Sequence, residues 1–244
     1  MTGTSQSTPG RRRRARLVLI FAALCAALVA VAAVSSAGAK NAKVLGKTRH
    51  TPNPVCPKNC SGVGSVTAFM RVADGVKFPF KVRKNGKLVA YALDLSRPSK
   101  KQRNFFGKIF KSHRFGKTPT ARLAVLRQNP HKRKKYRLLR QSPTVRLSSA
   151  LGRKQIFTLD KPLRIRKGQV VALTVPTWAS NFATQNVSSS ENQWRASRKQ
   201  GQCNTSNISN AKKSTPQQKV GSVRHYSCDY SAARILYWAY YVPK

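Results

Sequence analysis

Acidic residues are almost absent from this chain. Among its 244 residues there are 48 Lys and Arg but only five acids, which are Asp74, Asp94, Asp160, Glu191 and Asp229. General acid–base catalysis, glycoside hydrolysis and the binding of hard cations usually need carboxylates in pairs or clusters. Because the five acids are far apart in the sequence, these chemistries are disfavoured. The net charge of +43 makes anionic polymers and anionic surfaces the expected partners.

The sequence also lacks the patterns that mark metal and catalytic sites. Its histidines have no metal-ligand spacing, and no phosphate-binding loop, EF-hand or G-x-S-x-G nucleophile motif occurs. Triad residue types cluster only at His225, Ser227 and Asp229, and closeness in sequence is not catalytic geometry. We therefore expect no catalytic residue, no metal site and no cofactor. The enzymatic alternative is a glycan hydrolase that uses a carboxylate pair such as Asp94 and Asp160.

The N-terminal region has the three-part pattern of an export signal. Arg11 to Arg14 and Arg16 form a basic region, an apolar run extends from Leu17 to Val34, and Ala37-Gly38-Ala39 is a cleavage motif. The run of about 18 residues is at the low limit for a membrane span, so a retained N-terminal anchor is the alternative. In both cases the arginines stay in the cytoplasm and the rest of the chain lies outside. We expect an exported, extracellular or envelope protein.

Cysteine use agrees with export. Beyond the predicted signal there are four cysteines: Cys56, Cys60, Cys203 and Cys228. An even number in an exported chain favours disulfides over redox roles, and we expect the pairs Cys56–Cys60 and Cys203–Cys228. The second bridge would be worth roughly 3 kcal/mol by chain entropy. A zinc site made of the four cysteines is the alternative, although the pairs lack the usual knuckle spacing.

We divide the chain into a signal helix over 1–39, an exposed lead-in over 40–62 and a folded domain over 63–244. Residues 40–244 retain 43 basic residues and all five acids, a net charge of +38. A chain of this length can bury roughly 70% of its unfolded surface in a single core. We therefore expect the charge to coat a folded domain.

Short strands separated by turns are predicted for the folded domain. Alternation over 78–83, followed by the turn signal Asn85-Gly86, predicts a hairpin into a strand over 88–95. Further strands are predicted over 121–127, 136–139, 144–148, 156–159, 163–166, 170–175 and 235–242. No segment sustains a long helical pattern. We predict an all-β fold: an antiparallel β-sandwich or jelly-roll-like single domain with long basic and polar loops.

Three segments carry recurring strand and turn signatures: Gly-Lys-Leu-Val-Ala-Tyr at 86–91, Ala-Arg-Leu-Ala-Val-Leu-Arg at 121–127, and Lys-Pro-Leu-Arg-Ile-Arg-Lys-Gly-Gln-Val-Val-Ala-Leu at 161–173. Together they resemble a family of exported actinobacterial β-sandwich proteins with no established activity. The resemblance covers roughly 75–180 and the final strand. It implies the sandwich fold and a hairpin turn at Gly168. It carries over no catalytic residue.

The segment 100–117 is the first candidate contact for an anionic partner. It combines phenylalanines with a set of basic residues that includes Lys100, Lys101, Arg103, Lys108 and Lys111. A short cationic amphipathic helix here would suit an anionic membrane surface. The structural alternative is a long connection whose phenylalanines close one end of the sandwich.

The second candidate is a denser basic cluster before the strand predicted at 136–139. Its members are Lys132, Arg133, Lys134, Lys135 and Arg137. Such a cluster is a plausible polyanion contact. A solvated hairpin tip explains it equally well.

The polar stretch 186–222 offers a different kind of site. An exposed Trp194 among Ser, Asn and Gln side chains, joined by Trp178, would form a possible sugar-binding face. The structural alternative is packing of the tryptophans in the core or at its rim.

These features favour an exported, non-enzymatic, strongly cationic β-sandwich. Its expected partners are wall polymers, acidic polysaccharide, extracellular DNA or an anionic membrane surface, bound by salt-dependent electrostatics. A carbohydrate-binding or adhesion module that uses the two tryptophans is the second hypothesis, and the glycan hydrolase is the third.

Overall fold

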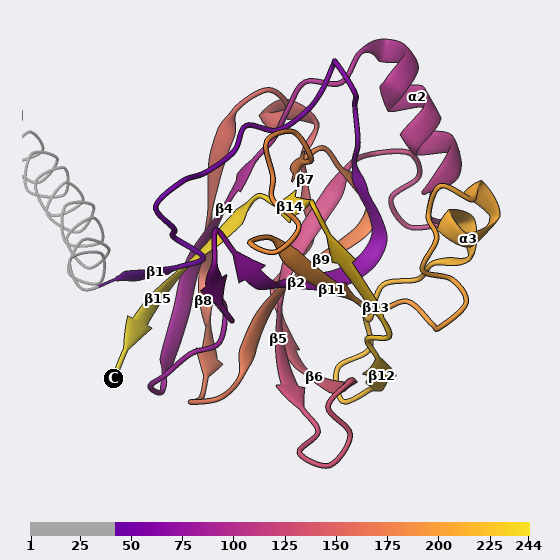
Figure 1. Cartoon of the computed structure of the whole chain (residues 1–244). Helices are drawn as coiled ribbons and strands as arrows, with labels where there is room; N and C mark the ends of the chain where they lie inside the picture. The colour runs from indigo at the N-terminus through magenta and orange to yellow at the C-terminus, as the bar shows by residue number, and fades with distance from the viewer. Residues whose placement is uncertain (1–41) are drawn as a thin grey trace, which may run out of the picture. The chain divides into compact units, whose positions relative to one another are not determined.

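Antiparallel β-sheets build the protein over residues 42–244, the part of the chain that the computed structural model describes. The compact unit Lys43–Lys244 contains every element of Figure 1 that is labelled. The predicted signal helix and its alternative, a membrane anchor, lie outside the described residues. Among residues 42–244 no helix has the length and apolar character needed to cross a membrane.

Two large sheets and a small strand pair make up the fold. The smaller of the two has the order β1-β15-β4-β8, formed by Lys43–Leu45, Tyr237–Pro243, Gly86–Asp94 and Lys154–Ile165. The larger has the order β12-β6-β5-β9-β2-β11-β13, formed by Val223–His225, Lys135–Gln141, Thr120–Gln128, Val170–Ala179, Val63–Ala73, Gln193–Ala196 and Cys228–Ser231. Additional short strands are β3 (Val76–Lys77) on β2, β7 (Val145–Arg146) on β5, and the pair β10 (Phe182–Ala183) and β14 (Arg234–Ile235). The helical elements are α2 (Lys100–Ile109), α3 (Ile208–Lys213) and the 3₁₀ turn η1 (Ser148–Ala150).

The predicted all-β, sandwich-like fold is confirmed. A continuous apolar core includes side chains from both sheets. Tyr237 of the smaller sheet stacks on Phe80, with ring centroids 4.0 Å apart, and its hydroxyl donates to the Val171 carbonyl of the larger sheet at 3.1 Å. Burial of this apolar surface is the main term that stabilises the fold.

Strand β2 is the main element that the sequence pattern did not predict. It pairs with β9 on one side and β11 on the other, and nearly all of its residues are buried. Because both faces of β2 are covered, its sequence does not alternate between apolar and polar residues. Strand β9 is buried along its full length for the same reason.

The hairpin predicted across Asn85-Gly86 is wrong. Gly86 opens β4, which pairs with β15 and β8 and not with the segment before the turn. Phe78 has a left-handed backbone with φ +51°, and Pro79 has no N–H to donate to a ladder. The segment 78–85 is therefore a loop, in which Phe80 and Val82 point into the core.

The turn at Gly168 also differs from the hairpin that the resemblance implied. It joins β8 to β9, and these strands belong to different sheets. Gly168 has φ +83°, a conformation that side chains rarely adopt. The turn is therefore a corner between the two layers of the sandwich.

Residues 43–62 contribute to the fold at several points. β1 forms an edge strand on β15, and Val55 is buried. The predicted disulfides Cys56–Cys60 and Cys203–Cys228 are both present. Two disulfides indicate an oxidising, extracellular environment.

Candidate functional site

The basic cluster begins in an ordered turn before β6 and continues into that strand with Lys135 and Arg137. The Asn129 side-chain oxygen accepts hydrogen bonds from the backbone N–H groups of His131 and Lys132, both at 2.9 Å. The Lys135 N–H closes the turn on the Lys132 carbonyl at 2.7 Å. Because these bonds use only Asn129 and the backbone, the side chains of 132–134 are left exposed to solvent.

A distant segment adds further basic groups to this turn. Strand β12 pairs with β6, so that Arg224 lies opposite Tyr136 and His225 lies opposite Lys135. The Tyr226 N–H donates to the Lys134 carbonyl at 2.7 Å, which continues the pairing beyond β12. No local pattern in the sequence predicts this arrangement, since β12 lies far from β6 along the chain.

Two hollows flank β12, and both are lined by basic residues. The first, of about 370 Å³, is lined by Arg127, Gln128, Asn129, Pro130, Arg137 and Val223. The second, of about 430 Å³, is lined by Ser197, Arg198, Lys199, Gln202, Lys213, Thr215, Val223, Arg224 and His225. Val223 lines both, so the hollows are adjacent, and neither is lined by a carboxylate.

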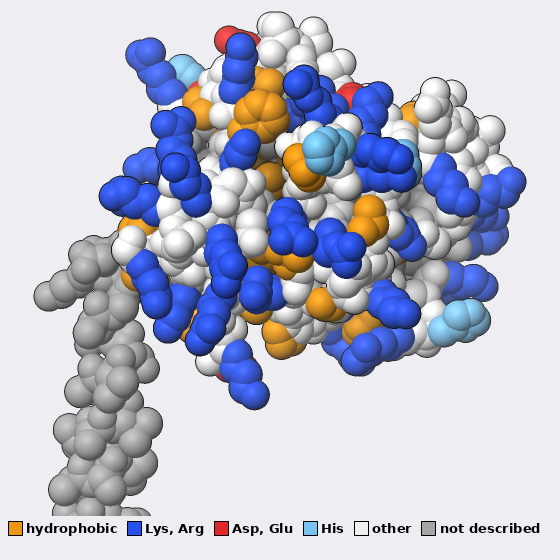
Figure 2. Space-filling view, turned by 90° about the horizontal axis from the view of Figure 1, so that it is seen from below, with side chains coloured by type: hydrophobic (Ala, Val, Ile, Leu, Met, Phe, Trp, Pro, Cys, Tyr) orange, Lys and Arg blue, Asp and Glu red, His pale blue; other side chains and the backbone are white. Residues whose placement is uncertain are grey.

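We name this region the β6–β12 basic surface. Its members are Arg127, Lys132, Arg133, Lys134, Lys135, Arg137, Lys199, Lys213, Arg224 and His225. Figure 2 views the molecule from the side on which the β6 turn lies in Figure 1. Lys and Arg side chains cover this face, with very few acidic side chains among them.

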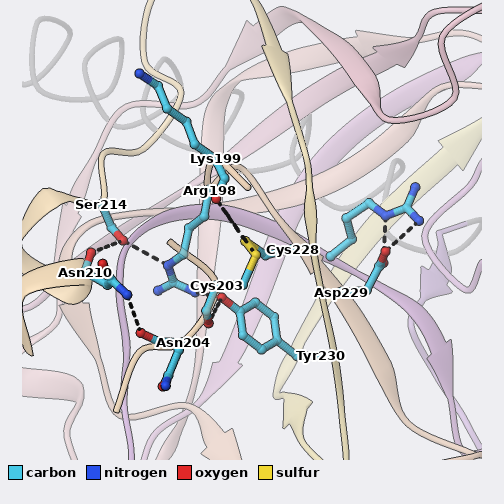
Figure 3. The surroundings of a disulfide bond; sticks show 10 residues. Arg198, Lys199, Cys203, Asn204, Asn210, Ser214, Cys228, Asp229 and Tyr230 are labelled. Carbon is cyan, nitrogen blue, oxygen red and sulfur yellow. Dashed lines mark hydrogen bonds and ion pairs between the residues drawn. A yellow bond between two sulfur atoms is a disulfide. The ribbon is translucent and has the colours of Figure 1, made fainter. Parts of the chain in front are cut away.

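A buried arginine lies beneath the second hollow. The Arg198 side chain donates to the Ser214 and Tyr230 hydroxyls, both at 3.0 Å (Figure 3). It also donates to the Gly64 carbonyl at 3.2 Å. Arg198 is 4% exposed, and none of these partners is a carboxylate. Its positive charge is therefore satisfied by hydrogen bonds without being neutralised, and it adds to the positive potential of the surface.

The Cys203–Cys228 bridge fixes the loop that carries Lys199. Cys228 belongs to β13, and the Tyr230 hydroxyl donates to the Cys203 carbonyl at 2.8 Å (Figure 3). The disulfide thus ties the loop to the edge of the larger sheet. It holds one wall of the second hollow in place.

The acid nearest to β12 in the sequence is Asp229, and arginines neutralise its charge. Its carboxylate accepts hydrogen bonds from the Arg195 side chain at 2.8 and 3.0 Å and from Arg71 at 3.2 Å. Partial burial raises the pKa of the Asp229 carboxyl, but the two arginines outweigh this effect and hold the pKa below its ordinary value. Asp229 is therefore a structural ion-pair residue, and it does not orient His225.

The other predicted basic cluster lies at the opposite end of the described unit (Figure 1). It forms α2, which begins with a capping box between Ser99 and Gln102. Phe106 and Phe110 pack in one cluster with Trp178, as the structural alternative for this segment expected, whereas Phe105 is exposed. The basic side chains Lys100, Lys101, Lys108 and Lys111 are exposed.

The predicted sugar-binding face is not formed. Trp194 is 4% exposed and stacks on Tyr230 with ring centroids 4.2 Å apart, and Trp178 is 1% exposed. The indole N–H of Trp178 donates to the Lys117 carbonyl at 2.8 Å. Phe106 and Phe110 pack with Trp178, and Phe182 and Tyr230 pack on Trp194, so both rings lie inside and cannot stack on a sugar in solvent.

The strand register also separates the acids proposed for hydrolysis. Asp94 lies opposite Lys154 on β8, and Asp160 is further along the same strand. The rise along a strand puts these carboxylates roughly 15–20 Å apart, whereas glycosidase pairs lie within about 10 Å. Among residues 42–244, no group of three or more His, Cys, Asp or Glu side chains is placed to hold a metal ion.

Comparisons with models of protein families, with curated proteins and with solved structures found no match to this chain. The resemblance of its strand signatures to exported actinobacterial β-sandwich proteins therefore stays a prediction.

Proposed function

We propose that this protein is exported and that its β6–β12 basic surface binds anionic polymers of the cell envelope or its surroundings, without catalysis. Phosphate-rich wall polymers, acidic polysaccharides and extracellular DNA have the required charge. One observation carries the proposal: cations and no carboxylate line two adjacent hollows. The ordered turn beside them carries three further exposed cations, Lys132, Arg133 and Lys134. The disulfides support the extracellular location.

The binding mechanism follows from polyelectrolyte physics. Lys and Arg side chains displace counterions condensed on the polymer, and release of these ions drives association. The exposed side chains of residues 131–134 can adapt to polymers of different spacing. Such contacts give broad specificity, and at physiological salt they act over about 8 Å. Affinity should therefore fall steeply as salt rises.

The test measures binding of residues 40–244 to isolated cell walls and to duplex DNA across a salt series. In the hairpin variant, Lys132, Arg133, Lys134 and Lys135 are all replaced by Gln. The slope of log K against log salt is negative, and each lost phosphate contact should reduce its magnitude on DNA by about 0.9. We expect the magnitude for the hairpin variant to be smaller by about 2–4 than for the unmodified protein, according to how many of the four groups make contact.

A matched control removes the same charge from the other end of the molecule. In the helix variant, Lys100, Lys101, Lys108 and Lys111 of the α2 region are replaced by Gln. We expect this variant to keep a slope close to that of the unmodified protein. Equal losses in the two variants would show that the charge acts globally and would remove the β6–β12 basic surface as a site.

A neutral polysaccharide completes the experiment. Since Trp178 and Trp194 are buried, we expect no binding to it at any salt concentration. Binding that is insensitive to salt would contradict the electrostatic mechanism and assign the function to a sugar-recognition site elsewhere.

A further inference from the structure

A second surface combines exposed apolar side chains with cations. Among residues 42–244, Val44, Val76 and Phe78 are exposed at 36%, 46% and 49%. They line one groove of about 390 Å³ beside β1, together with Leu45, Pro79, Tyr241, Pro243 and the cations Lys43, Lys77, Lys81, Arg83 and Lys84. No acidic residue lines the groove. We name this surface the Phe78 face.

The backbone holds Phe78 outward. Its N–H donates to the Arg71 carbonyl at 2.6 Å, and its carbonyl accepts from the Lys81 N–H at 3.0 Å. Its φ of +51° is a conformation that a bulky residue adopts only at an energetic cost. Two residues later, Phe80 is buried and anchors the loop in the core. The loop is thus fixed from below while it presents an aromatic ring to solvent.

Cations surround Phe78, and hydrogen bonds hold the backbone of its loop. The Lys81 ammonium lies 6.0 Å from the Phe78 ring centroid. The Tyr241 hydroxyl donates to the Lys84 carbonyl at 2.7 Å, which ties the end of the loop to β15. The Gly46 N–H donates to the Pro79 carbonyl at 3.1 Å, which ties the loop to the segment after β1.

We propose that the Phe78 face docks on an anionic lipid bilayer. Apolar side chains that enter the boundary between headgroups and acyl chains, together with Lys and Arg that reach the anionic headgroups, are the two contributions that hold a protein at a membrane surface. A soluble polyanion would use the cations but leave the apolar groups in water. The combination therefore favours a bilayer over a polymer at this face.

The position of β1 in the sequence supports this choice. The apolar run of the N-terminal region ends at Val34, nine residues before Lys43. Nine extended residues span at most about 30 Å. If the run is retained as an anchor, the Phe78 face is held within reach of the bilayer. The proposal rests on the export in the proposed function but uses none of the residues of the β6–β12 basic surface.

The sequence suggested a membrane contact at α2, but the structure favours the Phe78 face for this role. Phe106 and Phe110 are buried against Trp178, so only Phe105 remains exposed on that helix, at 51%. Phe105 is therefore a matched control: an exposed phenylalanine on a cationic segment elsewhere on the same protein.

The experiment measures sedimentation of residues 40–244 with vesicles of phosphatidylcholine alone and with 30% phosphatidylglycerol. These residues include both sheets, the core and both disulfides, so they are expected to fold without the N-terminal region. We expect binding to the anionic vesicles only. Phe78→Ala should weaken it by roughly tenfold with an unchanged salt slope, since it removes apolar contact and no charge. Phe105→Ala should bind like the unmodified protein.

Charge is tested separately. Replacing Lys77, Lys81 and Lys84 by Gln should lower the salt slope on anionic vesicles, and the hairpin variant should still bind them. Equal vesicle binding by Phe78→Ala and the unmodified protein, with thermal unfolding unchanged, would overturn the proposal. So would loss of wall-polymer binding alone in Phe78→Ala, which would assign the face to a polymer. A concentration-dependent dimer that Phe78→Ala abolishes would assign the face to a second copy and also overturn it.

Discussion

At the scale of single residues, one of the few carboxylates, Asp229, bonds two arginines. Asp229 forms an ion pair with Arg195, whose side chain is only 11% exposed, and a second ion pair with Arg71. A buried guanidinium that loses its partner is left with an uncompensated charge. Arg198 escapes this requirement because neutral oxygens satisfy all of its bonds.

We predict that Asp229→Asn lowers the free energy of unfolding at pH 7 by about 1–2 kcal/mol. The figure is below that of a fully buried pair because the Asp229 side chain is 35% exposed. Its pKa is depressed in the folded state, so its stabilisation is complete above the ordinary carboxyl pKa of 3.8 and is lost as pH falls through the folded-state pKa. Urea unfolding at several pH values should show the difference from the unmodified protein closing below that pH.

The control for this prediction is Asp160→Asn. It changes the net charge by the same amount at an exposed position on β8, and should change the unfolding free energy by less than about 0.5 kcal/mol. A similar loss in both variants would mean that added positive charge, and not the ion pair, causes the effect.

At the scale of elements, the predictable strands were those that an apolar run and a neighbouring turn signal mark in the sequence. β4, β5, β6 and β9 fall where the sequence predicts them, since apolar runs and turn signals mark them. β2 was missed because a strand covered on both faces has no alternation. The segment 78–83 shows the opposite case, because its sequence alternates but it does not form the predicted strand. In the loop that it forms, Phe78 is exposed and Phe80 is buried, whereas a strand would place both on the same face.

The candidate site likewise contains residues that the sequence pattern predicts and residues that it does not. A dense run of basic residues made the 131–137 cluster visible in the sequence. Arg224, His225 and Lys199 join it only through the pairing of β12 with β6 and through the loop fixed by the disulfide. The burial of the tryptophans was not predictable, because it depends on contacts with aromatic residues that are distant in sequence, such as Phe106 on Trp178 and Tyr230 on Trp194.

The Cys203–Cys228 bridge leads to a prediction at this scale. Replacing both cysteines by Ser should lower the unfolding free energy by about 3 kcal/mol through loop-closure entropy, while the same change at Cys56 and Cys60 should cost about 2 kcal/mol because the closed loop is shorter. Only the first variant should also weaken wall binding, since it frees the loop that carries Lys199. Equal effects of the two variants on binding would argue against that role for the disulfide.

At the scale of the whole molecule, the charge that favours polyanion binding opposes folding. Arg71 and Arg195 are the Lys or Arg residues that pair with a carboxylate within 4.0 Å in the region 42–244. Because most of the other cations in this region have no carboxylate within that distance, they repel one another. Salt weakens this repulsion, because the screening length falls from about 30 Å at 0.01 M to about 8 Å at 0.15 M.

The hairpin variant should therefore be more stable than the unmodified protein at low salt, although it binds polymers less well. Its four replaced side chains make no stabilising ion pair, and removing them lowers the self-repulsion of the folded state. In thermal unfolding at 0.01 M salt we expect its Tm to be a few degrees higher, about 2–4 °C for each kcal/mol gained. The two Tm values should converge at 0.3 M salt. A lower Tm for the variant at low salt would show that these cations stabilise the turn, and would favour a structural over a binding role for the cluster.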